Sequence, residues 1–318
     1  MAPLTSNLQI RIKRPPSQPA DLELIEAPRP ALTNGSFLAR AMWLALDPFR
    51  CSPEGGAPAA VRPGDLVPAR GVGEVIDSRH DVFGVGSLVE LDCGLQQLCV
   101  SNGQHARLLH PGQTPVSTAL GVLGTPGMAA YFGLLDAARL RLGETVLVSA
   151  AANAAGAMAG QIAMLKGARA IGIAGSREKC DWVTRHARLS ACINHSTENL
   201  SARLRQLAPH GVDVYFDNVG GALLEAIVAG HHFAPGARVV QNNLQPAPPA
   251  GVNGAQLLRI NARDYEHRRG EFLRAAIAWH GAGRIAAKEH IVEGLANAPA
   301  HLLLALQGGN FGRPLVRV

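Results

Sequence analysis

Aromatic side chains are scarce in this sequence: phenylalanine, tryptophan and tyrosine make up 4% of its 318 residues. Because hydrophobic residues still reach 47%, the buried core must consist mainly of alanine, valine, leucine and isoleucine. Charged residues make up only 17%, and this composition is that of a well-packed globule rather than a disordered chain. No apolar run reaches the length of about 18 residues that predicts a membrane span.

Long runs of basic residues are also missing, although the formal net charge is +6. The 30 lysines and arginines are dispersed, and no aromatic residues that could stack on bases are interleaved with them. We therefore expect no nucleic-acid partner. Dispersed positive charge favours instead an anionic small molecule, such as a phosphate-rich cofactor.

The cysteines form no CxxC pair, and their number, five, is odd. Scattered cysteines in an odd number predict reduced thiols in a cytoplasmic protein. No apolar segment follows the basic residues near the N-terminus, so we expect no secretion signal. We also expect no metal, because a catalytic zinc site needs three protein ligands around one ion. The cysteines are Cys51, Cys93, Cys99, Cys180 and Cys192.

Two kinds of pattern divide the chain. In the first third, turn-forming residues separate short apolar segments every 8 to 12 residues or so, which is typical of a small β-barrel or sandwich. From about Leu120, strand-like segments alternate with helical ones, and this alternation predicts an α/β, doubly wound parallel sheet. The length of the chain also favours two domains. The strand-like segments are residues 144–150, 170–174, 191–194, 212–217 and 238–241.

A turn of small residues joins the first of these strands to the next helix. It runs from Ala150 to Gly156 and contains a single glycine. Small residues at such a turn allow a pyrophosphate to approach the backbone N–H groups at the start of the helix. The turn therefore predicts a dinucleotide site, with an alanine-rich helix start as the alternative.

The end of the second strand indicates which dinucleotide binds. It reads Gly175-Ser176, followed by Arg177 and Lys179. An NAD enzyme would carry an acid at this strand end to bind the ribose hydroxyls. Hydroxyl and cationic donors suit a 2′-phosphate, so we predict NADPH rather than NADH. A helix start whose charges face water is the alternative.

Four segments together resemble the zinc-independent branch of the medium-chain dehydrogenases/reductases, which includes prostaglandin, plant double-bond and curcumin reductases. The resemblance extends over essentially the whole chain. It implies a GroES-like β domain, residues 1–118 completed by 284–318, and a Rossmann dinucleotide-binding domain, residues 119–283. The segments are residues 123–183, VDVYFDNVGG (212–221), LALDPFR (44–50) and GGNFGRPLVRV (308–318).

The resemblance implies an NADPH-dependent oxidoreductase, in a homodimer, that transfers a hydride to the conjugated C=C bond of a small α,β-unsaturated carbonyl compound. It assigns a substrate pocket to Phe49, Asn243 and Tyr265, and it assigns no catalytic residue. The residues implied to bind the cofactor are Asn153, Ala154, Ala155 and Gly156 at the pyrophosphate, Ser176, Lys179 and His195 at the adenosine end, and Asn218, Gln241, Asn242 and Asn310 near the nicotinamide.

The sequence departs from the family at several of these positions. Phe49 and Ala129 stand where the family has hydroxyl-bearing residues, and the loop after the fifth strand (QNNLQP, 241–246) has no tyrosine. Asn153 replaces a glycine, and we expect it to preserve the turn because asparagine tolerates left-handed backbone geometry. The missing donors leave two alternatives open: a non-redox cyclase or isomerase with a degenerate or structural cofactor site, and a non-catalytic binding protein. Residues 69–71 read Ala-Arg-Gly where zinc-dependent relatives carry Gly-His-Glu.

Overall fold

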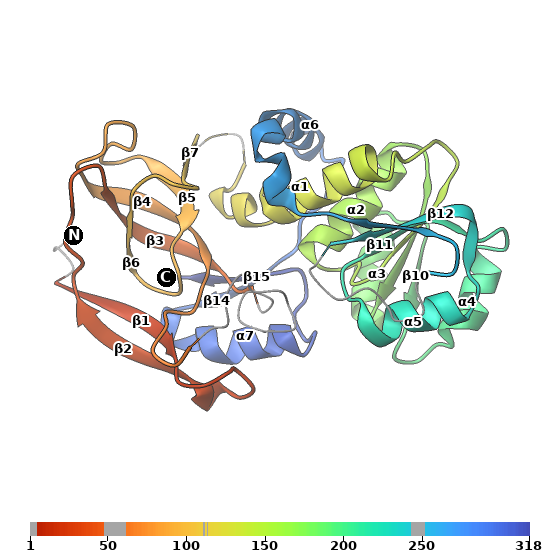
Figure 1. Cartoon of the computed structure of the whole chain (residues 1–318), viewed down its shortest axis with the longest axis horizontal. Helices are drawn as coiled ribbons and strands as arrows, with labels where there is room; N and C mark the ends of the chain where they lie inside the picture. The colour runs from red at the N-terminus through yellow and green to blue at the C-terminus, as the bar shows by residue number, and fades with distance from the viewer. Residues whose placement is uncertain (1–4, 48–61, 111, 113, 243–251) are drawn as a thin grey trace. The chain divides into compact units, whose positions relative to one another are not determined.

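The computed structural model describes residues 5–47, 62–110, 112, 114–242 and 252–318 (Figure 1). The chain forms two compact units. The first comprises Met1–Leu120 together with Glu289–Val318, and the second comprises Gly121–Lys288.

The first unit is built on a mixed seven-stranded sheet in which β3 (Phe37–Ala45) has three partners. One of them, β15 (Arg313–Arg317), comes from the C-terminal end and pairs antiparallel with β3, so the end of the chain completes this sheet. Side chains along β3 are largely buried, with Phe37 and Leu44 fully inaccessible. The other strands are β4 (Arg70–Ser78), β5 (Leu88–Asp92), β6 (Leu98–Ser101), β7 (Arg107–Leu109) and β14 (Glu289–Glu293), with β1 (Ser6–Ile12) and β2 (Leu22–Pro28) as a separate ribbon and α7 (Ala298–Leu306) beside the sheet.

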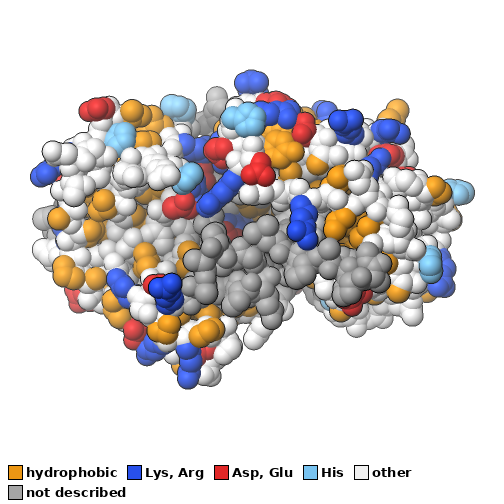
Figure 2. Space-filling view, viewed as in Figure 1, with side chains coloured by type: hydrophobic (Ala, Val, Ile, Leu, Met, Phe, Trp, Pro, Cys, Tyr) orange, Lys and Arg blue, Asp and Glu red, His pale blue; other side chains and the backbone are white. Residues whose placement is uncertain are grey.

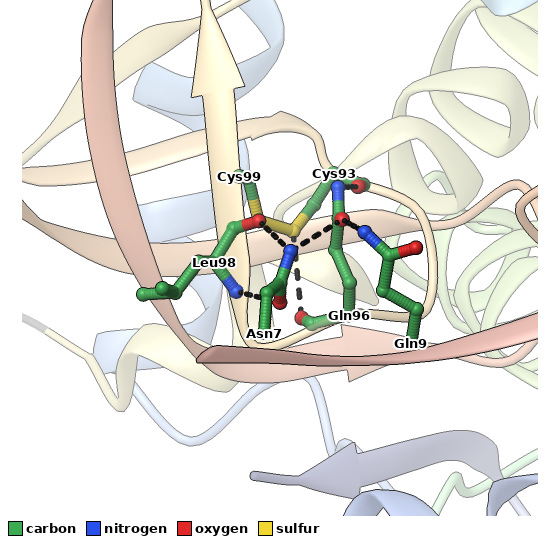
Figure 3. Close-up of a disulfide and its surroundings, with 6 residues drawn as sticks. All are labelled: Asn7, Gln9, Cys93, Gln96, Leu98 and Cys99. Carbon is green, nitrogen blue, oxygen red and sulfur yellow. Dashed lines mark hydrogen bonds between the residues drawn. A yellow bond between two sulfur atoms is a disulfide. The ribbon is translucent and has the colours of Figure 1, made fainter. Parts of the chain in front are cut away.

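A disulfide in this unit corrects one sequence prediction. Cys93 and Cys99 are bonded, with their Cα atoms 5.3 Å apart, and both side chains are buried (Figure 3). The segment between them turns from β5 into β6 and is held by Asn7, whose amide donates to Gln96 Oε1 and to the Leu98 carbonyl, each at 3.0 Å. The expectation of reduced thiols was therefore wrong for this pair, because sequence spacing does not reveal which cysteines a turn brings together.

The second unit is a six-stranded, fully parallel sheet with helices packed against it (Figure 1). Numbered in chain order within the unit, its strands lie in the order 3-2-1-4-5-6, which is the order of the Rossmann fold. The strands are β8 (Thr145–Val148), β9 (Arg169–Ala174), β10 (Ala191–Asn194), β11 (Val212–Asp217), β12 (Phe233–Gln241) and β13 (Gln256–Arg259); the helices are α1 (Thr125–Phe132), α2 (Ala154–Leu165), α3 (Arg177–Arg185), α4 (Leu200–Leu207), α5 (Gly221–Ala229) and α6 (Arg269–Gly281).

The strand order creates a switch point between β8 and β11. After β8 the chain adds β9 and β10 on one side, and it then crosses to add β11, β12 and β13 on the other. Loops that leave neighbouring strands at such a point run in opposite directions, which opens a crevice at the carboxyl ends of the strands where ligands bind. Both strands are largely apolar and buried, because helices cover the sheet, and buried polar residues gather at their carboxyl ends: Ser149 after β8, and Asp217 and Asn218 at the end of β11.

The surface agrees with the dispersed charge of the sequence. On the face drawn in Figure 2, lysine and arginine side chains are interspersed with acidic ones. Among the described residues, no helix combines the length and the apolar character needed to cross a bilayer.

Candidate functional site

The turn after β8 begins the site. Ala150 has a positive φ of 48°, whereas Asn153 is extended, with φ −85° and ψ 173°. Asn153 instead caps α2: its side-chain oxygen accepts a hydrogen bond from the Gly156 N–H at 2.6 Å. The turn is therefore present with asparagine in place of glycine, and asparagine's tolerance of left-handed geometry is not what preserves it. The chain reverses directly after the strand, so Ala150 adopts that conformation, and the asparagine acts as an N-cap.

Gly156 lets α2 approach the strand closely. A Cβ atom at this position would lie 2.4 Å from the Ala150 carbonyl oxygen and 3.0 Å from Ala151 Cα, closer than atoms of a rigid backbone can come. The preceding residues, Ala154 and Ala155, are small and nearly buried. The first turn of α2 therefore offers backbone N–H groups and the positive end of the helix dipole, which together suit a pyrophosphate.

A second cluster lies at the neighbouring ends of β9 and β10. Ser176 caps α3 by accepting a hydrogen bond from the Lys179 N–H at 3.2 Å. His195 follows β10, and a Cβ atom on Gly175 would lie 3.3 Å from its Nε2, so the imidazole packs over this glycine. Ser196 joins the two strand ends by donating to the Gly175 carbonyl at 2.9 Å. Residues about 20 positions apart thus bring the Ser176 and Ser196 hydroxyls, the His195 imidazole and the backbone of Lys179 to neighbouring strand ends.

The ammonium of this cluster is partly removed from water. Burial lowers the pKa of Lys179 below its ordinary value, and the nearby Glu178 carboxylate opposes this effect. A partly buried cation is stabilised by an anion that approaches it. The cluster is therefore electrostatically suited to a phosphate group.

A polar network occupies the switch point itself. The Ser149 hydroxyl donates to Asp217 Oδ1 at 3.1 Å and accepts from the Asn218 N–H at 2.8 Å. The Asn218 amide donates to the Ser149 carbonyl, and its oxygen accepts from the Asn242 amide, both at 2.8 Å. These bonds fix the orientation of the Asn218 amide and link the ends of β8, β11 and β12.

Asp217 is the centre of this network and is inaccessible to solvent. Its Oδ1 atom also accepts from the Tyr215 hydroxyl at 2.9 Å and from the N–H groups of Val219 and Gly220 at 3.1 and 2.9 Å. Burial, followed by the Asp217 charge, raises the pKa of Tyr215 well above its ordinary value, so this phenol remains protonated as a donor. The carboxylate therefore holds the loop that carries Asn218.

Gln241 lies beside Asp217 in the parallel register of β11 and β12. Its side chain is fully buried, yet within the part of the chain that the structure describes neither Gln241 Oε1 nor Nε2 has a hydrogen-bond partner, and neither does Asp217 Oδ2. Buried polar atoms without a partner are costly and rare. Three such atoms at the switch point indicate a place for a polar group from outside the chain.

Comparison with known proteins agrees with this geometry. Residues 8–109 match a family model described as the N-terminal domain of oxidoreductase, and residues 154–265 match one described as zinc-binding dehydrogenase. Prostaglandin reductase 1 from Bos taurus is 35% identical over 314 residues, which cover 94% of each chain. The NADPH-dependent curcumin reductase of Escherichia coli is 35% identical over 306 residues, which cover 90% of this chain and 88% of the relative.

A solved structure is similar over the same extent. The crystal structure of CurA from Vibrio vulnificus in complex with NADPH has a TM-score of 0.89 at 32% identity, covering 98% of this chain and 99% of that one. The chain belongs to the zinc-independent branch of the medium-chain dehydrogenase/reductase family. The predicted fold class, a GroES-like β domain with a Rossmann domain, is confirmed.

In this medium-chain reductase an arginine occupies the place where zinc-dependent relatives carry the histidine of Gly-His-Glu. Arg70 is nearly buried on β4 and donates to the buried Glu90 carboxylate at 2.8 Å and to the His105 carbonyl at 2.9 Å. A guanidinium cannot ligate a cation. Among the described residues there is no group of three or more His, Cys, Asp and Glu side chains that could hold a metal ion.

Two other residues predicted for the substrate pocket and the cofactor site, Tyr265 and Asn310, have contacts outside the two clusters and the network described above. Tyr265 stacks on Phe132, with ring centroids 4.4 Å apart, and its hydroxyl bonds to Asp136. Asn310 donates from its amide to the Gly312 carbonyl at 2.8 Å within the first unit. Phe49 and Asn243 lie outside the described residues.

Ser149, Tyr215 and Asp217 were not among the site residues predicted from the sequence. A signal was available, because each is a polar residue within or directly after an otherwise apolar strand segment. Such a residue in a fully covered sheet needs a partner. The partners could not be identified, since Ser149 and Asp217 are 68 residues apart.

Proposed function

We propose that the chain is an NADPH-dependent reductase of the conjugated C=C bond of a small α,β-unsaturated ketone or aldehyde. The main support for this proposal is the group of residues at the ends of β9 and β10. There Ser176, Lys179 and His195 lie near one another, at the place where a 2′-phosphate is expected. The relatives give independent support, since one is named an NADPH-dependent curcumin reductase and the similar structure contains NADPH. We also propose a homodimer, as the family resemblance implies, and a cytoplasmic location, as the cysteine pattern indicates; light scattering would test the mass of the dimer.

The residues present fit the cofactor. The first turn of α2 would hold the pyrophosphate through Asn153, Ala154, Ala155 and Gly156, and the cluster at Ser176, Lys179 and His195 would hold the 2′-phosphate. The unpartnered amide of Gln241 and the oriented amides of Asn218 and Asn242 would face the nicotinamide end. Asn310 is proposed as a further cofactor contact, and Phe49, Asn243 and Tyr265 as residues of the substrate pocket.

The bound cofactor would supply a hydride for the β-carbon of the substrate. The protein's own contribution would be to position the nicotinamide and to donate hydrogen bonds to the carbonyl oxygen of the substrate, on which negative charge develops. The Asn218 amide is held by the carbonyl of Ser149 and by Asn242. An amide held in this way keeps its orientation during the reaction, which lowers the cost of reorganisation.

The activity is tested by following NADPH oxidation with a panel of enones and enals. We expect the absorbance of NADPH to fall only when a conjugated substrate is present, and the product to be the saturated carbonyl compound. NADPH binding without turnover on any member of the panel would contradict the proposal and favour a non-redox reaction on the same scaffold.

Replacing Lys179 with alanine is expected to weaken NADPH binding by roughly tenfold to a hundredfold, the effect of losing one hydrogen bond between charged groups. NADH, which has no 2′-phosphate, should bind with nearly unchanged affinity. Calorimetric titration with both nucleotides measures the difference.

Lys166→Ala is a matched control, because Lys166 lies at the opposite end of α2 and its ammonium is 5.9 Å from the Trp279 ring centroid. This control removes the same charge from the same unit and should leave both affinities unchanged. Equal losses of NADPH and NADH affinity in Lys179→Ala would show that this lysine does not bind the 2′-phosphate.

A further inference from the structure

Two thiols face each other beside the proposed 2′-phosphate site. Cys180 belongs to α3 and Cys192 to β10, both are free cysteines, and both are partly exposed. Their side chains hydrogen bond to each other. The proposed reaction needs neither of them.

The packing of α3 on the sheet explains why the sulfur atoms meet. Cys192 pairs with Gly172 of β9, and a Cβ atom at Gly172 would lie 3.4 Å from Cys192 Sγ and 3.0 Å from Val183 of α3. The Cys192 side chain therefore points from the sheet towards α3. Cys180 precedes Val183 by three residues and so lies on the same face of the helix. Both sulfur atoms occupy the layer between α3 and the sheet.

The pair has the chemistry of an attacking and a resolving thiol. The hydrogen bond from Cys192 lowers the pKa of Cys180, whereas the pKa of Cys192 is raised by the same bond and by burial. The thiolate is the nucleophile in disulfide exchange, so Cys180 is the sulfur that reacts first. Partial exposure gives a small oxidant access to it.

We propose that Cys180 and Cys192 form a site of reversible disulfide formation that a low-molecular-weight disulfide oxidises. The Cys180 thiolate attacks the disulfide RSSR, forms a mixed disulfide and releases one thiolate RS⁻. The Cys192 thiol then loses its proton and attacks Cys180 Sγ, which releases the second RS⁻. In total, two protein thiols are oxidised to one disulfide, and RSSR is reduced to two molecules of RSH once the protons are taken up.

The new disulfide would change the geometry of the proposed 2′-phosphate site, and this part of the inference rests on the proposed function. The Cys180 N–H donates to the Ser176 carbonyl at 3.0 Å, and a backbone group of Ala174, at the end of β9, bonds to Cys180 Sγ. Formation of the disulfide draws Cys180 towards β10 and replaces the hydrogen bonds of Cys180 Sγ with Cys192 and with the Ala174 backbone by a covalent bond. The turn that positions Ser176 and Lys179 moves with it, so the oxidised protein binds NADPH more weakly.

The experiment treats the full chain with glutathione disulfide or with dithiothreitol and then applies peptide mapping by mass spectrometry. We expect a peptide that links Cys180 to Cys192 after oxidation of the wild type, which dithiothreitol reverses. This peptide should be absent from Cys180→Ser and Cys192→Ser and present in Cys51→Ser. Absence of the link from the oxidised wild type, or pairing with Cys51 instead, would overturn the proposal.

NADPH titration of the same samples tests the coupling. We expect oxidation to weaken binding about tenfold, the loss of one well-placed hydrogen bond to a charged group, in the wild type and in Cys51→Ser but in neither of the other variants. A linked protein with unchanged affinity would overturn the coupling. Failure of both reduced and oxidised protein to bind NADPH would instead contradict the proposed function, while the mapped disulfide would still stand.

Discussion

Gly156→Ala is expected to destabilise the second unit by about 3 kcal/mol and to weaken NADPH binding by more than about a hundredfold. The added methyl group would lie 2.4 Å from the Ala150 carbonyl oxygen and 2.9 Å from its carbon. Both atoms belong to the turn after β8, so relief requires α2 to move away from the sheet. This movement also displaces the first-turn N–H groups that are proposed to bind the pyrophosphate. Urea denaturation and NADPH titration measure the two effects.

Gly281→Ala is the matched control, because it adds the same methyl group at the end of α6, where no atom other than those of the adjacent residues and the helix backbone lies within 4 Å. It should leave NADPH affinity unchanged and alter the free energy of unfolding by less than about 1 kcal/mol. If Gly156→Ala behaved like Gly281→Ala, the close approach of α2 to the strand would not be a requirement of the site.

Asp217→Ala is expected to reduce the free energy of unfolding by about 4 kcal/mol, since a buried donor that loses its acceptor costs about 1–3 kcal/mol. Asp217 Oδ1 accepts from two hydroxyl groups, those of Ser149 and Tyr215, and from the N–H groups of two residues of the following loop. The same loop carries Asn218, so we also expect NADPH affinity to fall by at least about tenfold. Urea denaturation and NADPH titration again provide the measurements.

Two further variants separate folding from positioning. Asp217→Asn keeps one oxygen acceptor and should fold, with a smaller loss of stability but a misplaced Asn218 and weakened NADPH binding. Asp213→Ala, on the same strand, removes a carboxylate that accepts one backbone hydrogen bond, from the Thr145 N–H at 2.8 Å, and should retain NADPH affinity. Retained affinity in Asp217→Asn would show that Asp217 is structural and does not position the cofactor site.

The existence of the turn after β8 could be predicted from the sequence, but the backbone conformation of its residues could not. Small residues between a strand and a helix predicted the turn, because only such residues allow the helix to pack close to the sheet. The way in which Asn153 preserves the turn was not predicted: its side chain caps α2, while Ala150 takes the positive φ. The local sequence is compatible with a positive φ at Asn153 and with a positive φ at Ala150. The direction in which the chain leaves β8 decides that Ala150 takes it.

Hydrogen bonds between residues far apart in the chain could not be predicted from the sequence. Asp217 is a fully buried acid at the end of a largely apolar strand, but its partner Ser149 is 68 residues away. The Cys93–Cys99 disulfide was missed although its residues are only six apart, because a disulfide depends on the direction of the Cβ atoms and not on spacing.

The sequence by itself determined the alternation of strands and helices, the turn of small residues after the first strand of the second unit, and the hydroxyl and cation of Ser176 and Lys179 that are proposed to bind the cofactor, because periodicity, residue size and charge are local properties. The tertiary structure decided which strand ends lie together: β9 with β10, which joins His195 to Ser176, and β8 with β11, which buries Asp217 against Ser149. These neighbours follow from the order of the strands in the sheet. That order depends on how separated segments bury their apolar faces against one another, and no single segment contains that information.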